Sequence, residues 1–176
     1  MPNVEYMNGL SPEGNGTSPA TLNVGGGGEF IVNELRLSQS KGAGGVVNLN
    51  TNGVMRVNYM RMDGNHIAYF NFNGGILESR SESRNFFGRD SSHSEYSRWA
   101  DVKCKVLKGG AVFDGTSRWL FMRVPLESGV EAGETDGGVK VIGGNKGDDK
   151  LGKWRVTYTS NDAYLTFIKG TALIIR

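Results

Sequence analysis

The chain has 176 residues and a formal net charge of +2, from 20 basic and 18 acidic residues. These charges are interspersed, which argues against a nucleic-acid-binding protein, and no apolar run is long enough for a transmembrane helix. The 27 glycines, with only 4 prolines, are about twice the average usage of about 7 % and predict many tight turns.

Residues 1–28 are expected to form an extended leader. This segment holds three of the four prolines and ends in the glycine run Gly25 to Gly28. Such a composition is typical of linkers and of segments that lie along a neighbouring chain. Its start has neither the basic residues nor the apolar stretch of a signal peptide, so no secretory leader is expected.

Residues 29–78 are predicted to form a meander of short strands, because apolar and polar residues alternate along several runs. Turn sequences separate these runs, and Asn52-Gly53 favours a type I′ hairpin because both residues tolerate positive φ. Several runs carry large apolar or aromatic groups on both faces, such as Met60 opposite Tyr59 and Phe70 opposite Tyr69. Without helices to cover both faces, another sheet or another copy of the chain must do so.

Residues 79–99 are a polar connecting segment, and residues 100–176 are expected to form a C-terminal β tip domain. Val102, Cys104 and Val106 alternate with lysines, which predicts a half-buried strand with the single cysteine in the core. The long region from Glu127 to Lys150 is rich in glycine and has little strand pattern. Loops of this length are usually functional or disordered.

The stretch Gly25 to Gly75 (GGGGEFIVNELRLSQSKGAGGVVNLNTNGVMRVNYMRMDGNHIAYFNFNGG) resembles the C-terminal part of a tailed-bacteriophage tail fibre. Such fibres repeat a strand, an Asn-Gly or Asp-Gly turn and another strand. The resemblance implies a virion tail protein: a parallel homotrimer with an elongated, intertwined β shaft and a distal, β-sandwich-like tip. It also implies contact with other virion tail proteins and, through the tip, with the host surface.

Catalytic and metal-binding patterns are weak in this sequence. His66 and His93 are far apart and Cys104 stands alone, so zinc-ligand spacing is absent. The pair Asp148-Asp149 lacks the alternation of ligands in a calcium loop. No nucleophile elbow or phosphate-binding loop occurs. No metal or cofactor is therefore expected.

Glycosidase chemistry requires two carboxyl groups about 5–9.5 Å apart. Sequence alone cannot pair the acidic residues of the C-terminal loops, and we expect no enzyme activity. The same loops are suited to binding. Trp99 could stack on a sugar ring, and the arginines around it could meet an acidic polysaccharide. The simpler interpretation of these arginines is a solvated loop. The candidate receptor-binding residues are Trp99, Arg84, Arg89, Arg98, Glu131, Glu134, Asp136, Asn145, Lys146, Asp148 and Asp149.

The sequence thus predicts an all-β, homotrimeric tail-fibre component that attaches to a bacterial surface glycan or outer-membrane protein through its distal loops. No contact with nucleic acid and no insertion into a membrane are expected. Two alternatives remain open. One is a purely structural trimerisation, baseplate or capsid accessory protein. The other is a polysaccharide-degrading tailspike.

Overall fold

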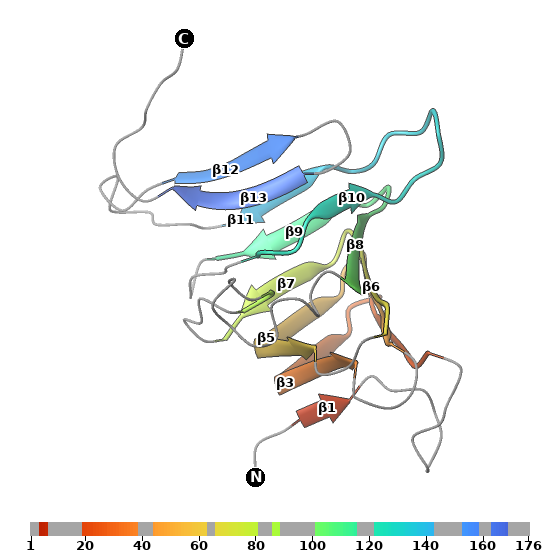
Figure 1. Cartoon of the computed structure of the whole chain (residues 1–176), viewed down its shortest axis with the longest axis vertical. Coiled ribbons are helices and arrows are strands. Elements are labelled where there is room, and N and C mark those ends of the chain that lie inside the picture. The colour runs from red at the N-terminus through yellow and green to blue at the C-terminus, as the bar shows by residue number, and fades with distance from the viewer. Residues whose placement is uncertain are drawn as a thin grey trace.

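A computed structural model shows an all-β chain whose strands rise from the N-terminal toward the C-terminal end, with the last two in reverse order (Figure 1). It describes residues 4–6, 19–38, 44–62, 66–80, 86–88, 101–115, 122–142, 153–158 and 163–168, with 4–6, 153–158 and 163–168 as backbone only. No helix occurs in these ranges, so none that could span a membrane is found there. The predicted fold class is confirmed at the level of an all-β chain.

The strands form two sheets. Sheet A consists, in spatial order, of β1 (Val4–Tyr6), β3 (Glu29–Ser38), β5 (Val54–Met62), β7 (Ile76–Ser79), β9 (Ala111–Asp114) and β11 (Val139–Ile142). Sheet B consists of β12 (Lys153–Tyr158), β13 (Ala163–Ile168), β10 (Leu126–Ser128), β8 (Val102–Val106), β6 (Ala68–Asn73), β4 (Val46–Asn50) and β2 (Thr21–Val24). From β2 to β11 the chain alternates between the sheets, and each strand pairs in parallel with the strand two places further on.

This connectivity winds the chain into a β-solenoid of about four turns. The hairpin β12–β13 continues sheet B in antiparallel fashion, through the pairing of β13 with β10. Because β6 pairs with β8 and β7 with β9, both sheets continue across the predicted polar connection at residues 79–99. The predicted domain boundaries themselves stay predictions.

The core lies between the sheets and is built from side chains that repeat from turn to turn. Val24, Leu49, Phe72 and Val106 occupy one register position of sheet B, and each is at most 4 % exposed. Aromatic rings connect successive turns, with ring centroids 5.2 Å apart between Phe72 and Phe113. Each turn thus buries the apolar face of its neighbours, as in other repeat architectures.

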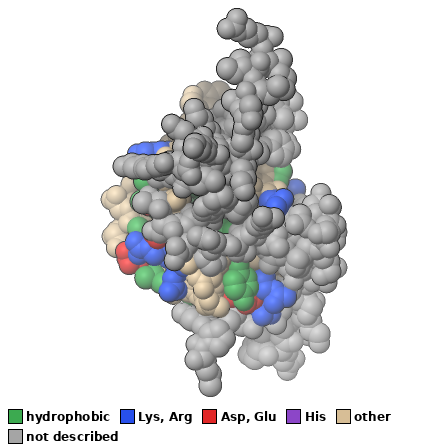
Figure 2. Space-filling model, turned by 90° about the vertical axis from the view of Figure 1, so that its left-hand side faces the viewer, with side chains coloured by type: hydrophobic (Ala, Val, Ile, Leu, Met, Phe, Trp, Pro, Cys, Tyr) green, Lys and Arg blue, Asp and Glu red, His purple; other side chains and the backbone are tan. Residues whose placement is uncertain are grey.

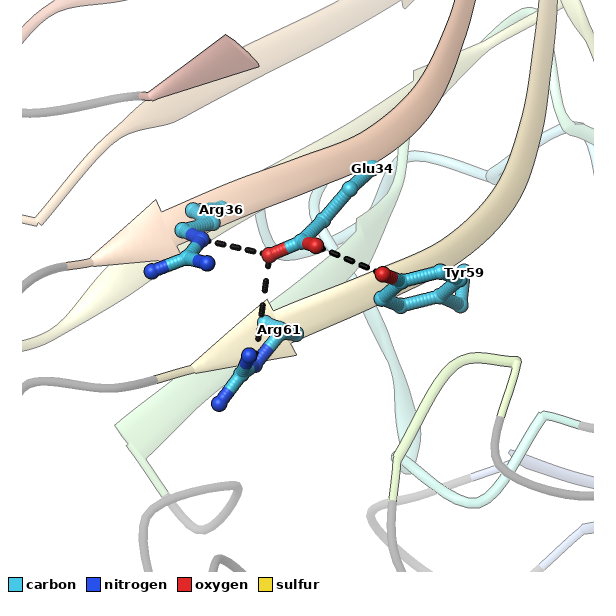
Figure 3. A network of polar contacts seen from close by, with 4 residues as sticks. All are labelled: Glu34, Arg36, Tyr59 and Arg61. Carbon is cyan, nitrogen blue, oxygen red and sulfur yellow. Dashed lines mark hydrogen bonds and ion pairs between the residues drawn. The ribbon is translucent and has the colours of Figure 1, made fainter. Parts of the chain in front are cut away.

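The predicted faces of β5 are wrong in one respect. Alternation with period two puts Met55 and Val57 on the face opposite Met60 and Met62, yet all four side chains are buried. The strand bends between Val57 and Met60, so the inward phase shifts by one residue. Strand β3 has the same three-residue step in its burial pattern, and Figure 3 shows both ribbons curving side by side.

Beyond this bend, other residues of the chain lie against β5 and against each other. The N–H of Met60 donates to the carbonyl oxygen of Phe86 at 3.0 Å, and Phe87 forms a parallel bridge with Met122. Phe86, Phe87 and Met122 are all buried. The chain therefore covers the inward side of the long strands with its own residues.

The predicted hairpin at Asn52-Gly53 is also wrong. Strand β4 pairs with β2 and β6, both in parallel, and not with β5. The turn is a corner that carries the chain from sheet B to sheet A. Asn52 does have a positive φ of 62°, but Gly53 is not among the glycines with positive φ.

The homotrimer and the sandwich-like tip stay predictions. Strands with apolar groups on both faces need cover from another sheet or from another copy of the chain. For Met60 and Phe70 that cover comes from the same chain, since both are fully buried. Their neighbours Tyr59 and Tyr69 point outward and are half-buried and 36 % exposed, respectively. On the side shown in Figure 2, small groups of basic, acidic and apolar side chains lie beside one another among the described residues.

Candidate functional site

The outward side chains of sheet B form the most regular polar surface in the described part of the chain. We call this surface the asparagine face. It comprises Thr21, Asn23, Val46, Asn48, Asn50, Tyr69, Asn71, Asn73, Lys103, Lys105 and Glu127. Their inward neighbours fill the core, so the strand pleat fixes which residues point outward.

A ladder of amides runs along this face, perpendicular to the strands. Asn48 donates from Nδ2 to Oδ1 of Asn23 at 2.7 Å, and Asn71 donates to Oδ1 of Asn48 at 2.7 Å. The parallel register places these three residues side by side. Each of these bonds uses one of the two amide hydrogens of the donor and one lone pair of the acceptor oxygen. The remaining hydrogens and lone pairs are the groups with which such a ladder can bind sugar hydroxyls.

A second amide pair continues the ladder at the corner. Asn73 donates to Oδ1 of Asn50 at 3.2 Å, and its own Oδ1 accepts from the backbone N–H of Gly109 at 3.0 Å. The hydroxyl of Thr51 donates to the carbonyl oxygen of Asn73 at 3.1 Å. These contacts connect three successive corners and hold the edge of the face in place.

Tyr69 is the exposed aromatic residue of the asparagine face. It is 36 % exposed, and it pairs in register with Lys103. The ammonium of Lys105 lies 5.7 Å from the centroid of the Tyr69 ring, within cation–π range. An aromatic ring beside two lysines and an amide ladder can stack on the apolar side of a sugar while the lysines meet its acidic groups.

A charged network lies at the bend of β3 and β5, on another side of the solenoid (Figure 3). The carboxylate of Glu34 accepts from the hydroxyl of Tyr59 at 2.7 Å, pairs with Arg36, and lies 3.9 Å from Nε of Arg61. Glu34 is only 4 % exposed, so these partners compensate a buried charge. The hydrogen bond to Glu34, followed by burial, raises the pKa of Tyr59.

The contacts within this network explain why a carboxylate can be buried here. A single acidic group accepts from a tyrosine and pairs with two arginines, which suits the bracing of a bend. An amide pair marks the same bend, since Asn58 donates to Oδ1 of Asn33. We therefore assign the network a structural role.

A second ion cluster lies on the outer face of sheet A. Arg56 bonds Glu78 at 2.7 Å and Glu29 at 2.8 Å. Hydrogen bonds to Glu29 and then to Glu78 raise the pKa of Arg56. The three residues come from β3, β5 and β7, so the cluster joins adjacent turns.

Of the predicted receptor-binding residues, the structure describes only three. Glu131 and Glu134 are exposed, and Asp136 is half-buried, in the loop between β10 and β11. Glu134 pairs with Lys108 at 2.6 Å, and Asp136 accepts from the N–H of Gly138 at 3.0 Å. The first contact braces the loop against the corner before β9, and the second lies within the loop. The other predicted residues lie outside the described residues: Trp99, Arg84, Arg89, Arg98, Asn145, Lys146, Asp148 and Asp149.

Sequence reasoning missed the asparagine face and Tyr69. The available signal was the recurrence of asparagine two residues apart in VNLN and FNFN, with a single asparagine in TLNV. These segments align in sheet B at separations of 25 and 23 residues, as between Thr21, Val46 and Tyr69. Reading the asparagines as turn residues and polar alternation concealed this repeat.

The cysteine and the described histidine differ in their exposure. Cys104 is fully buried between Val102 and Val106, as predicted, and burial, followed by the charge of Glu127, raises its pKa well above the ordinary value. His66 is exposed, and His93 lies outside the described residues. No group of metal-ligating side chains occurs among the residues that the structure describes.

Comparisons of this chain with protein families, with curated proteins and with solved structures found no match. The asparagine face and the sequence itself are therefore the features that indicate a function.

Proposed function

We propose that this protein binds an acidic glycan through the asparagine face and does not cleave it. Binding to a bacterial surface as part of a virion tail fibre is the setting that the sequence resemblance implies. The observation that supports the glycan most directly is Tyr69, an exposed aromatic ring held between an amide ladder and two lysines.

The shape of the face favours a linear polymer. Neighbouring strands of a sheet lie about 4.7–4.9 Å apart, so the ladder offers amide groups at a regular spacing along the solenoid. Asn23, Asn48 and Asn71 provide three such amide groups. Beyond them the same row continues with Lys105 and Glu127. Lysine ammonium groups act as point charges that attract carboxylates or phosphates without demanding one geometry.

A binding role fits the described carboxylates better than a hydrolytic one. Glu34 is paired with two arginines, and Glu78 with Arg56. Glu134 is paired with Lys108 at the corner before β9. Each of these carboxylates thus has a basic partner within the chain, whereas glycoside hydrolysis requires two carboxyl groups that flank the substrate.

Affinity electrophoresis tests the proposal. The intact protein is run in gels that contain alginate, a linear polyuronate, or dextran, a neutral glucan. We expect retardation by alginate that weakens with added salt, because screening reduces contacts between exposed charges. Tyr69→Ala and the double change Lys103→Ala/Lys105→Ala are expected to lose most of it.

Lys108→Ala is the matched control, because Lys108 is an exposed lysine at a corner, paired with Glu134 and outside the asparagine face. Its retardation should equal that of the parent. Equal retardation of all variants would place any glycan contact elsewhere. No retardation by alginate at low salt would overturn the acidic-glycan proposal and favour a structural role.

A further inference from the structure

The outer face of sheet A carries two rows of side chains along the solenoid. The first row consists, in order, of Glu29, Val54, Ile76, Val112 and Lys140. The second row, two residues further along each strand, consists of Ile31, Arg56, Glu78, Asp114 and Ile142. Both rows point away from the core, because the residues between them, such as Met55 and Leu77, are buried.

The centre of the first row is aliphatic. Val54, Ile76 and Val112 are half-buried on the outer side, and Ile31 beside them is 44 % exposed. The corresponding outward positions of sheet B carry mostly asparagine and lysine. Covering aliphatic surface stabilises an assembly, so this face favours contact with another apolar surface.

The first row on this face has opposite charges at its two ends. The first row begins with acidic Glu29, whose side chain is 50 % exposed, and ends with exposed, basic Lys140. The second row begins and ends with isoleucine and has its charges between them. A surface with opposite charges at its two ends complements a reversed copy of itself.

We propose that a second copy of this chain docks on the outer face of sheet A, antiparallel to the first and related to it by a two-fold axis along the strands. Such an axis reverses the order of each row. Glu29 then faces Lys140 of the second copy, and Val54 faces Val112 of the second copy. Ile76 lies on the axis and faces its own counterpart. The first row thus contributes an aliphatic centre closed by an ion pair at each end.

The second row supports the same arrangement. Ile31 faces Ile142 of the second copy, and Arg56 faces Asp114 of the second copy. Glu78 faces its own counterpart, which brings like charges together. Arg56 already bonds Glu78 within each chain, and this contact offsets the repulsion.

A parallel arrangement of two copies is much less favourable. A two-fold axis along the solenoid would set the first row of one copy against the second row of the other. Val54 would then face Arg56, Ile76 would face Glu78, and Val112 would face Asp114. Each contact would set a charge against an aliphatic group and form no ion pair between the copies, whereas the antiparallel order pairs Glu29 with Lys140 and Arg56 with Asp114. The order of residues therefore selects the antiparallel dimer.

The first test is the mass of the full chain in solution, by light scattering over a range of concentrations. We expect a dimer, at twice the chain mass of 19.1 kDa. Site-specific cross-linking then locates the interface. Ile76→Cys should give a covalent dimer with a short bismaleimide, because residue 76 lies on the axis. Val46→Cys, half-buried on the outer face of sheet B, is the matched control and should stay uncross-linked. The native Cys104 is fully buried.

A charge exchange tests the orientation. Lys140→Glu places two acidic groups opposite each other at both ends of the row, and we expect the dissociation constant to rise at least about tenfold. Adding Glu29→Lys should restore part of the affinity, because the pair is then reversed. Lys108→Glu makes the same charge change outside this face and should leave the mass unchanged.

A monomer at all concentrations, or a trimer at three times the chain mass, would overturn the antiparallel dimer. A dimer that is unaffected by Lys140→Glu and by Ile76→Asp, with the fold retained by circular dichroism, would also overturn it. These outcomes are independent of alginate binding, since the asparagine face lies on the other sheet.

Discussion

The corners between sheet B and sheet A show how single atoms limit the choice of residue. Successive corners lie against one another, as when the N–H of Gly26 donates to the carbonyl oxygen of Thr51 at 3.1 Å. A Cβ atom at Gly53 would lie 2.5 Å from the carbonyl oxygen of Val24. At Gly26 nothing lies within 4 Å, but φ is 61°. Gly53 is required because a side chain has no space there, and Gly26 is favoured because of its positive φ.

We predict that Gly53→Ala destabilises the protein by about 1–3 kcal/mol, because the added methyl group overlaps backbone that cannot rotate away. In a chain of this size the melting temperature should fall by about 2–4 °C per kcal/mol. Thermal unfolding followed by circular dichroism measures the change.

Gly26→Asn is the control for this substitution. Asparagine tolerates the left-handed region, and Asn52 already has a φ of 62° in the next corner. Its melting temperature should change little. If Gly53→Ala melts with the parent, the corners are further apart than described.

Some features of the fold could be predicted from the sequence, and others could not. Asn52-Gly53 identified a turn and the positive φ of Asn52, but a turn sequence does not specify the partner of the strand that follows. Period-two alternation placed Cys104 in the core correctly. It failed at Met55 and Met60, because the bend at Asn58 shifts the phase and no local propensity marks that bend. The asparagine face depends on pairing between residues more than twenty positions apart, which local patterns do not contain.

At the scale of the element, parallel stacking turns a sequence repeat into a column of identical side chains. Asn23, Asn48 and Asn71 belong to three different strands, yet they form one hydrogen-bonded ladder. The residues of such a column do not contribute equally. Asn48 makes two ladder bonds, whereas Asn23, at the end of the described ladder, makes one of them.

We predict that Asn48→Ala lowers the free energy of unfolding by about 1–2 kcal/mol, since a net hydrogen bond contributes about 0.5–1.5 kcal/mol. Asn23→Ala removes one bond at an exposed position and should cost less than half as much. Urea unfolding of the two variants measures the difference. Equal losses would show that the ladder bonds exchange freely with water and do not act as a connected column.

At the scale of the whole molecule, stability depends on contacts between neighbouring turns. Phe72 in β6 lies against Phe113 in β9, and both are buried. Both sheets also continue through β8 and β9. In repeat architectures, nearest-neighbour contacts of this kind couple the units into cooperative unfolding.

We predict one unfolding transition for the solenoid by calorimetry, shifted downward by Phe72→Ala and by Phe113→Ala alike. Each substitution should cost about 3–5 kcal/mol, the usual range for removing a buried phenylalanine. Independent domains on either side of residues 79–99 would instead give two transitions. In that case Phe72→Ala and Phe113→Ala would each lower a different one.

The even stacking of β2, β4 and β6 also has an evolutionary consequence. A gene for such a chain can gain or lose the codons of one whole turn. Such a change leaves the alternation of inward and outward side chains intact in the remaining strands. Residues 26–50 are one such unit. If they were deleted, Thr51 would follow Gly25 in the way that it now follows Asn50. Asn23 would take the place of Asn48 beside Asn71. Descendants of this gene are therefore expected to differ in height by whole turns, while their cross-section stays constant.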